Sequence, residues 1–455
     1  MFADRKEFKE VAAALLTGQR SLALYPLGHP HIKTALEDCF RILRTLLQRE
    51  RQIPIVLAGN EFVVGDLQIP IAGEAFEELA TLLRGAGVEK LIFVEGLRSW
   101  ELRALLLALN MDEEALEAAG GVETILESEE VEHIVATPLA VESSDDEIPD
   151  MLVRAWETYT AGLRVVRRLR QGYKKSGSLE NLDETKEFVR DIVELGAQHT
   201  RPLLALQSLK VHDEYSFTHS INVATLTLVM AQGLNFGKYD LHETTLAAIL
   251  HDIGKERVSG ELLRKPGRLN DAEWKEMADH NLLGAKMLAT TDGVGDLSAI
   301  VAYEHHLTQD RTSPDAAKWR LHLVSEIVTI ADVYDALRST RPYRAEIPAD
   351  RAMEIMHEEA PKKFNPDLFA GFAKLVGYYP PGICVRLSND EVGIVYRANP
   401  DALRQPAVLV VHGADGTKLG TPRRVDLATS DGGEELTVAE VLVAEDAGVD
   451  PFDYL

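Results

Sequence analysis

Cysteine is almost absent from this sequence, which has only Cys39 and Cys384 among its 455 residues. So few thiols exclude a disulfide framework and favour a reducing compartment. The sequence also lacks any uninterrupted apolar run of the ~20 residues that a membrane span requires. Its first residues lack the apolar core of a signal peptide. We therefore expect a cytoplasmic protein with no membrane span.

Positive charge is also in short supply. The chain has 48 lysine and arginine residues against 73 aspartate and glutamate residues, which gives a net charge of −25. General binding to nucleic acid or to an anionic membrane requires a basic face, so the balance argues against both. A small anionic ligand in a locally basic pocket remains compatible with this charge. The hydrophobic fraction of 45% is that of a globular protein.

The length predicts two or three domains. Apolar spacing and turn residues predict a mainly helical, multidomain chain with five regions. These are an α+β domain with a regulatory or docking role (1–140), an acidic linker (141–150), a helical connector (151–200), an all-helical domain (201–380) and a small β tail (381–455). We see no catalytic constellation in the first region, so a sensory, docking or dimerisation role is expected there.

Three finer expectations concern the connecting and terminal segments. Residues 121–150 contain ten acidic residues and no lysine or arginine, which we interpret as a solvated linker. The connector carries Arg164, Arg167, Arg168 and Arg170, which predict a solvated basic helix face or pairing with the linker. Its amphipathic length alone suggests a homodimer. Residues 428–455 are expected to be loosely held.

The dipeptide His251-Asp252 lies near the predicted end of a helix. A neutral imidazole and a carboxylate are both metal ligands, and a carboxylate can bridge two ions that activate water. Alone, such a dipeptide is more often structural than catalytic. A capping box at Asp240 and Glu243 is predicted to open this helix, and another at Asn270 and Glu273 to open a later one.

Further ligand-type residues recur along the same helical region. A single histidine on a helix is more often a hydrogen-bonded core residue than a ligand. Five histidines and two aspartates in one region favour an iron, manganese or zinc site instead, and a shared carboxylate suits a pair of ions. The set is His219, His251, Asp252, His280, His305, His306 and Asp332.

These residues stand within longer blocks. The blocks are Thr218-His219-Ser220, His251-Asp252-Ile253-Gly254-Lys255, the run from Leu263 to Leu269, His280, His305-His306, the run from Ala331 to Leu337, and Arg341-Pro342-Tyr343-Arg344. Together they resemble the HD-GYP domain, a bacterial branch of the HD phosphohydrolases, over roughly 200–380. Tyr379-Pro380-Pro381-Gly382, followed by strands, resembles the β tail that many of these proteins carry.

The resemblance implies a helical bundle that binds two or three metal ions, usually iron or manganese. It also implies hydrolysis of cyclic di-GMP or a related cyclic dinucleotide to a linear dinucleotide or to mononucleotides, in bacterial second-messenger signalling. Transferred by position, one ion is held by His219, His251, Asp252 and Asp332, and the second by His280, His305 and His306, with Asp252 as the bridge. Catalysis falls to Asp252 and Lys255, and contacts with the substrate phosphates to Lys255, Arg341 and Arg344.

Two of these cationic side chains could have a structural role instead of binding substrate. Lys255 could satisfy helix-end carbonyls, and Arg341 could form a structural ion pair. The sequence also departs from the family at two places. Leu307 replaces the glutamate that follows the paired histidines, and the Gly-Tyr-Pro loop is reduced to Ser313-Pro314. Tyr215 stands where some members have the glutamate that holds a third ion, so two ions are expected here.

The altered loop leaves a second hypothesis open. A catalytically weak or silent member would bind a cyclic dinucleotide or a partner protein, and would pass the signal through the N-terminal domain. A third reading, an HD phosphohydrolase acting on another nucleotide, is disfavoured by the Lys265-Pro266-Gly267 and Arg341-Pro342-Tyr343-Arg344 blocks.

Overall fold

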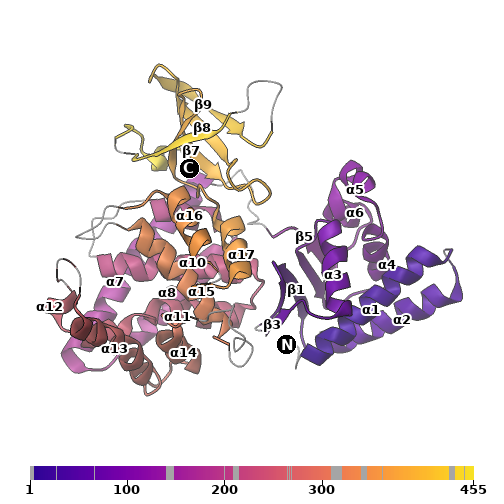
Figure 1. Cartoon of the computed structure of the whole chain (residues 1–455), viewed down its shortest axis with the longest axis horizontal. Helices are drawn as coiled ribbons and strands as arrows, with labels where there is room; N and C mark the ends of the chain where they lie inside the picture. Colours follow the sequence, from indigo (N-terminus) through magenta and orange to yellow (C-terminus); the bar gives the residue numbers. More distant parts are fainter. Residues whose placement is uncertain are drawn as a thin grey trace. The chain divides into compact units, whose positions relative to one another are not determined.

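The structure is a computed structural model, shown in Figure 1. It describes residues 5–26, 28–65, 67–139, 148–198, 200–208, 215–263, 265, 267, 269–308, 320–339, 346–360, 362–429, 436–444 and 446–454. The chain forms two compact units: residues 1–140 with 234–236, and residues 141–233 with 237–455. The fold class predicted from the sequence is confirmed, since an N-terminal α+β region, a helical region and a small C-terminal sheet follow one another along the chain. The division into five regions stays a prediction.

The first unit is built on a five-stranded antiparallel sheet in the order β3-β2-β1-β4-β5. Short runs of β-prone apolar residues form these strands, and β1 and β2 bury consecutive residues and therefore both of their faces. The first three strands of the sheet form an antiparallel meander. Its strands are β1 (Gln52–Ala58), β2 (Glu61–Val64) and β3 (Leu67–Pro70), followed by β4 (Lys90–Val94) and β5 (Ile134–Thr137).

Helices pack against this sheet around one apolar core. Phe8 of the first helix stacks on Phe76 with ring centroids 5.3 Å apart, and meets Phe62 of β2 edge-on at 5.2 Å. The helices are α1 (Arg5–Leu24), α2 (Pro30–Leu47), α3 (Glu74–Gly85), α4 (Ser99–Ala108), α5 (Glu113–Ala119) and α6 (Gly121–Ser128).

The interpretation of residues 121–150 as a solvated linker is wrong for the first part of that stretch. Residues 121–128 form α6, and residues 134–137 form an edge strand of the sheet. The acidic side chains concealed the apolar residues between them, since Val122, Leu126, Ile134 and Ala136 are all buried in the core. Residues 140–147 lie outside the described part of the chain.

The second unit begins with two long helices, α7 (Ile148–Ser176) and α8 (Leu182–Gln198), as predicted for the connector. Further helices, several of them short, then form the bundle. They are α9 (Thr200–Ala205), η1 (Leu206–Ser208), α10 (Tyr215–Gly233), α11 (Lys238–Leu250), η2 (Ile253–Arg257), α12 (Gly260–Leu263), α13 (Asp271–Leu288), α14 (Asp296–Glu304), α15 (Leu323–Arg338), α16 (Ala349–Glu359) and α17 (Pro366–Val376). Within the described part of the chain, no helix has the length and apolar character needed to cross a membrane.

One of the two predicted capping boxes is present. Asn270 Oδ1 accepts the backbone N–H of Glu273, whose carboxylate accepts the N–H of Asn270, so α13 begins as expected. The box at Asp240 and Glu243 is wrong, because α11 begins two residues earlier, after Gly237. Asp240 instead lies in the first turn, where a carboxylate favourably meets the positive end of the helix dipole.

The chain ends in a second antiparallel sheet with the order β10-β6-β7-β8-β9. Its buried valines pack with Ala349 of α16, so the sheet shares a core with the last part of the bundle. The expectation that residues 428–455 are loosely held is wrong for residues 438–442, which pair with β6. The strands are β6 (Cys384–Leu387), β7 (Val392–Arg397), β8 (Ala407–His412), β9 (Lys418–Asp426) and β10 (Val438–Leu442), and the short helix η3 (Pro451–Asp453) follows.

Candidate metal centre

The predicted ligands lie at helix ends and within helices that bring them together. His251 is the C-cap residue that follows α11, and Asp252 directly precedes η2. His305 follows α14 in the same way, while His280 lies inside α13. All seven predicted ligands are buried except His306, whose side chain is 46% exposed. Segments far apart in the sequence therefore converge on one buried polar site.

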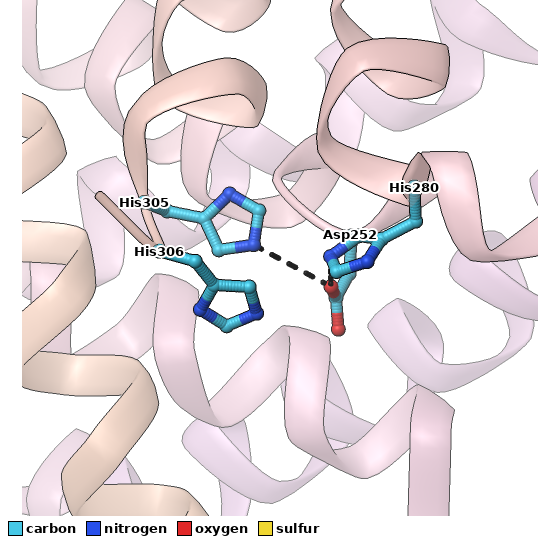
Figure 2. A group of neighbouring side chains, drawn as sticks. All are labelled: Asp252, His280, His305 and His306. Atoms are coloured by element: carbon cyan, nitrogen blue, oxygen red, sulfur yellow. Dashed lines mark ion pairs between the residues drawn. The ribbon is translucent and has the colours of Figure 1, made fainter. Parts of the chain in front are cut away.

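Asp252 lies at the centre of this site. Its Oδ1 is 3.3 Å from His280 Nε2 and 3.7 Å from His305 Nε2. Its Oδ2 is 3.5 Å from His251 Nε2 and 3.7 Å from His219 Nε2. Each oxygen thus faces its own pair of histidines, and Figure 2 shows the imidazole rings on the Oδ1 side gathered around the carboxylate. Both groups have ligand atoms close enough to hold an ion: Asp252 with His280, His305 and His306, and Asp252 with His219 and His251.

The other ring nitrogen of each central histidine fixes its tautomer. Nδ1 of His251 donates to the carbonyl oxygen of Ala248 at 2.7 Å, and Nδ1 of His280 donates to that of Met277 at 2.5 Å. His305 Nδ1 donates in the same way to the carbonyls of its own helix. Because Nδ1 carries the proton, Nε2 presents a lone pair to the site, which is how a backbone-anchored histidine binds a metal.

These lone pairs are not satisfied by protein atoms. Among the described residues, Nε2 of His251, His280 and His305 and Oδ1 of Asp252 are buried without a hydrogen-bond partner. Burying an acceptor without a hydrogen-bond partner costs about 1–3 kcal/mol. Here the lone pairs of these acceptors also face and repel one another. A cation placed among them removes both penalties. The residues present therefore fit a divalent metal ion.

His219 has a different second partner. Its Nδ1 donates to Asp335 Oδ2 at 2.7 Å, and its Nε2 is 3.2 Å from Asp332 Oδ1. Burial lowers the pKa of His219, but the contacts with Asp332 and Asp335 outweigh it and raise the pKa to about 9. Without a metal, a proton on His219 neutralises this side of the site.

Sequence reasoning missed Asp335 and its neighbour Asn222. Asn222 Nδ2 donates to Asp335 Oδ1 at 2.7 Å, which orients the carboxylate that holds His219. A carboxylate behind a ligating histidine sets its tautomer and orientation. The spacing of Asp332 and Asp335 on one helix face was the available signal.

The electrostatics of the remaining ligands suit metal binding. Burial raises the pKa of Asp252, but Lys255 and His251 outweigh it and hold the pKa well below its usual value. Burial lowers the pKa of His305, and burial together with His305 lowers that of His306 to about 4. Both carboxylate and imidazole must be deprotonated to bind a metal, and these residues already are near neutral pH.

A close backbone approach fixes η2 against α13. A Cβ atom on Gly254 would lie 1.9 Å from the carbonyl oxygen of His280 and 2.7 Å from the nitrogen of Gly284. Backbone atoms cannot move aside as a flexible side chain can. Glycine at position 254 therefore lets Asp252 and His280 come within reach of one ion.

The predicted substrate-binding residues are only partly described. Lys255 Nζ lies 2.5 Å from Asp252 Oδ2, and its side chain is 30% exposed. It is therefore at the site and open to solvent. Arg341 and Arg344 lie outside the described residues, as does Ser313-Pro314 of the altered loop. Leu307, which follows the paired histidines, is described and partly buried.

Comparison with known proteins shows which family the region around this site resembles. Residues 187–368 match the family described as the HD domain, and all seven predicted ligands lie in that range. The cyclic di-GMP phosphodiesterase PA4108 of Pseudomonas aeruginosa is 34% identical over 253 residues, which cover 55% of this chain and 61% of that protein. The 3'3'-cGAMP-specific phosphodiesterase 3 of Vibrio cholerae is 34% identical over 167 residues, 36% of each chain.

A third relative is more distant. A cyclic di-GMP phosphodiesterase of Thermotoga maritima is 27% identical over 237 residues, which cover 49% of this chain and 62% of that protein. The matches thus span less than two thirds of each of these relatives. The helical bundle thus carries the match to the HD domain, and the resemblance to the HD-GYP proteins predicted from the sequence is confirmed. HD phosphohydrolases depend on metal, and the histidine and aspartate groups described above could hold it.

Proposed function

We propose that this chain is a metal-dependent phosphodiesterase that hydrolyses a cyclic dinucleotide. The observation that carries the proposal is Asp252, which lies between two groups of histidines. Three of these histidines, His251, His280 and His305, have a buried Nε2 with no hydrogen-bond partner among the described residues. The names of the relatives support the substrate class, since they act on cyclic di-GMP or 3'3'-cGAMP. Cyclic di-GMP or 3'3'-cGAMP would be opened to a linear dinucleotide or cut to mononucleotides.

We propose two divalent ions, iron or manganese, because the resemblance to the HD-GYP proteins implies these metals and mixed histidine and carboxylate ligands suit them. His219, His251, Asp252 and Asp332 would hold one, and His280, His305, His306 and Asp252 the other. When bound, such ions supply Lewis acidity that activates water and offsets charge on phosphoryl oxygens. A third ion is not expected, because Tyr215 stands at the place of its glutamate.

The chain's own residues would do the remaining work. The carbonyls behind His251, His280 and His305 hold each ring with Nε2 turned inward. Lys255, partly exposed beside Asp252, would meet a substrate phosphate, as would Arg341 and Arg344. Positive groups at such positions stabilise charge that develops in the transition state. The N-terminal unit would serve as a regulatory or docking domain for a signalling partner.

The test is hydrolysis of cyclic di-GMP and 3'3'-cGAMP by protein purified with Mn²⁺ or Fe²⁺, with products resolved by chromatography. We expect turnover that is lost in Asp252→Asn and retained in Glu101→Gln, a matched carboxylate-to-amide change in the other unit. Absence of turnover in fully metal-loaded wild-type protein would overturn the proposal.

A second candidate is a receptor that binds a cyclic dinucleotide without cleaving it. The replacement of the family glutamate by Leu307, together with the loss of the Gly-Tyr-Pro loop, favours it. The same preparation separates the two functions, because saturable binding by calorimetry without product would support the receptor.

A further inference from the structure

Helix α7 contains a buried arginine. The side chain of Arg170 is 4% exposed, whereas that of Arg168, two residues earlier, is 54% exposed and pairs with Glu184 at 2.7 Å. The prediction of a solvated basic face is therefore wrong for Arg170. A guanidinium can be buried only when its charge and N–H groups are paired. Its partners therefore identify what the side chain holds.

The guanidinium of Arg170 joins two segments of the metal centre. Nη2 donates to Ser220 Oγ at 2.8 Å, and Nη1 lies 3.7 Å from Glu256 Oε1. Ser220 directly follows His219 on α10. Glu256 belongs to η2, the short helix that begins directly after Asp252. One planar group thus connects the residue next to His219 with the short helix that follows Asp252.

The same face of α7 makes further contacts with η2. Lys174 Nζ lies 3.0 Å from Glu256 Oε2, and Arg257 Nε donates to the hydroxyl of Tyr173. The Arg257 guanidinium also lies 5.1 Å from the centroid of the Tyr173 ring. Positions 170, 173 and 174 share one helix face because they are three and four residues apart. Helix η2 is therefore held along its side by α7.

A second route leads from α7 to His219. The hydroxyl of Tyr159 donates to Asn222 Oδ1 at 2.8 Å, Asn222 donates to Asp335, and Asp335 accepts from His219 Nδ1. Tyr159 and Arg170 are about three helical turns apart, so they lie on the same side of α7. His219 is thus supported through two side chains of one helix.

We infer that Arg170 is a positioning residue of the metal centre, which fixes His219 relative to Asp252 and so sets the affinity for metal. The inference rests on the proposed function, because it takes His219 and Asp252 as ligands. Residues that hydrogen-bond directly to metal ligands typically change metal affinity by about 10–100-fold when they are replaced, and Arg170 lies one contact further out. Arg170 would act in this way without touching metal or substrate.

The test compares wild-type protein with Arg170→Met and with the control Arg168→Met, which removes an exposed charge from the same helix. Mn²⁺ affinity is measured by competition with a chelator, and ligand geometry by the visible absorption of Co²⁺-loaded protein. We expect Arg170→Met to weaken Mn²⁺ binding about tenfold or more and to shift the Co²⁺ spectrum. Arg168→Met should stay within about twofold of wild type.

Arg170→Lys separates the two contacts. An ammonium group can meet Glu256 but cannot also span to Ser220 as a planar guanidinium does. We expect an Mn²⁺ affinity between those of wild type and Arg170→Met. A folded Arg170→Met protein with wild-type affinity and spectrum overturns the inference.

Two milder variants apply if Arg170→Met does not fold. Ser220→Ala and Tyr159→Phe each remove one hydroxyl and should each weaken Mn²⁺ binding severalfold; wild-type affinity in both overturns the inference. The proposed function fails separately. If metal-loaded wild-type protein hydrolyses neither cyclic dinucleotide, the proposed function is contradicted. The dependence of metal affinity on Arg170 is tested independently by the Mn²⁺ titrations.

Discussion

The N-terminal unit and the helical bundle each bury a carboxylate against histidine, and they satisfy it in different ways. In the N-terminal unit, Glu101 is fully buried and accepts hydrogen bonds from the backbone N–H groups of Arg98, Glu132 and His133. It also accepts from His133 Nδ1 at 2.9 Å. Every oxygen has a donor, so the site is complete without a ligand.

The carboxylate of Asp252 is the opposite case. Three of its histidine neighbours, His251, His280 and His305, direct their Nδ1 protons to backbone carbonyls and present lone pairs to it. Of the two buried sites, only this one leaves acceptors facing acceptors. The difference shows that burial beside histidine does not identify a metal site by itself. The direction of the histidine protons does, because it determines whether the centre of the cluster is already satisfied.

The largest expected effect comes from Asp252→Asn. An amide cannot bridge two ions and places N–H groups where lone pairs are required, so metal content should fall and turnover should drop by about a thousandfold or more. Metal analysis of the purified protein and product formation under saturating substrate measure this. Glu101→Gln is the control; if both variants lose metal equally, the distinction between the two sites is lost.

Gly254→Ala should also damage the centre. The new Cβ would meet the backbone of His280 and Gly284, so η2 and α13 must separate at a cost of about 3 kcal/mol. Denaturant unfolding of the bundle and metal content report the two effects. Gly85→Ala is the matched change, since a Cβ there has nothing within 4 Å. Unchanged stability and metal content in Gly254→Ala would show that the close approach does not matter.

Glu101→Gln should destabilise the N-terminal unit alone. Glutamine turns an NH₂ group toward backbone donors, which costs about 2 kcal/mol. Hydrogen exchange of the amides at residues 98–102 and 132–137 should quicken, while exchange in the bundle stays as in wild type. Faster exchange in α13 and α14 would show that the two sites are not independent.

The smallest effect concerns acid stability. Burial raises the pKa of Glu101, but the hydrogen bonds from His133 and from the backbone outweigh it, so the pKa lies below its usual value. A lowered folded-state pKa means that its contribution to stability is complete above the unfolded value of ~4.3 and is lost as pH falls further. The stability gap between wild type and Glu101→Gln should therefore be constant from pH 7 to about 5 and shrink below that. A gap that grows on acidification would contradict this sign.

Much of the site could be predicted from sequence because each ligand lies in a recognisable block on a periodic helix. The geometry could not. Asp335 was missed because its role depends on the rotation of α15 against α10. The prediction for Arg170 was wrong because the sequence shows which charges lie on a helix face but not which residues pack against that face. The acidic stretch over residues 121–150 hid a helix and a strand in its first part, because composition outweighed the spacing of a few buried apolar residues.

Anomalous diffraction from crystals of the Mn²⁺-loaded protein would test the central claim most directly. The account predicts metal beside both oxygens of Asp252, with His280 and His305 as neighbours on one side and His219 and His251 on the other. Anomalous peaks elsewhere in the molecule, or none at Asp252 in protein that is folded and saturated with Mn²⁺, would contradict it.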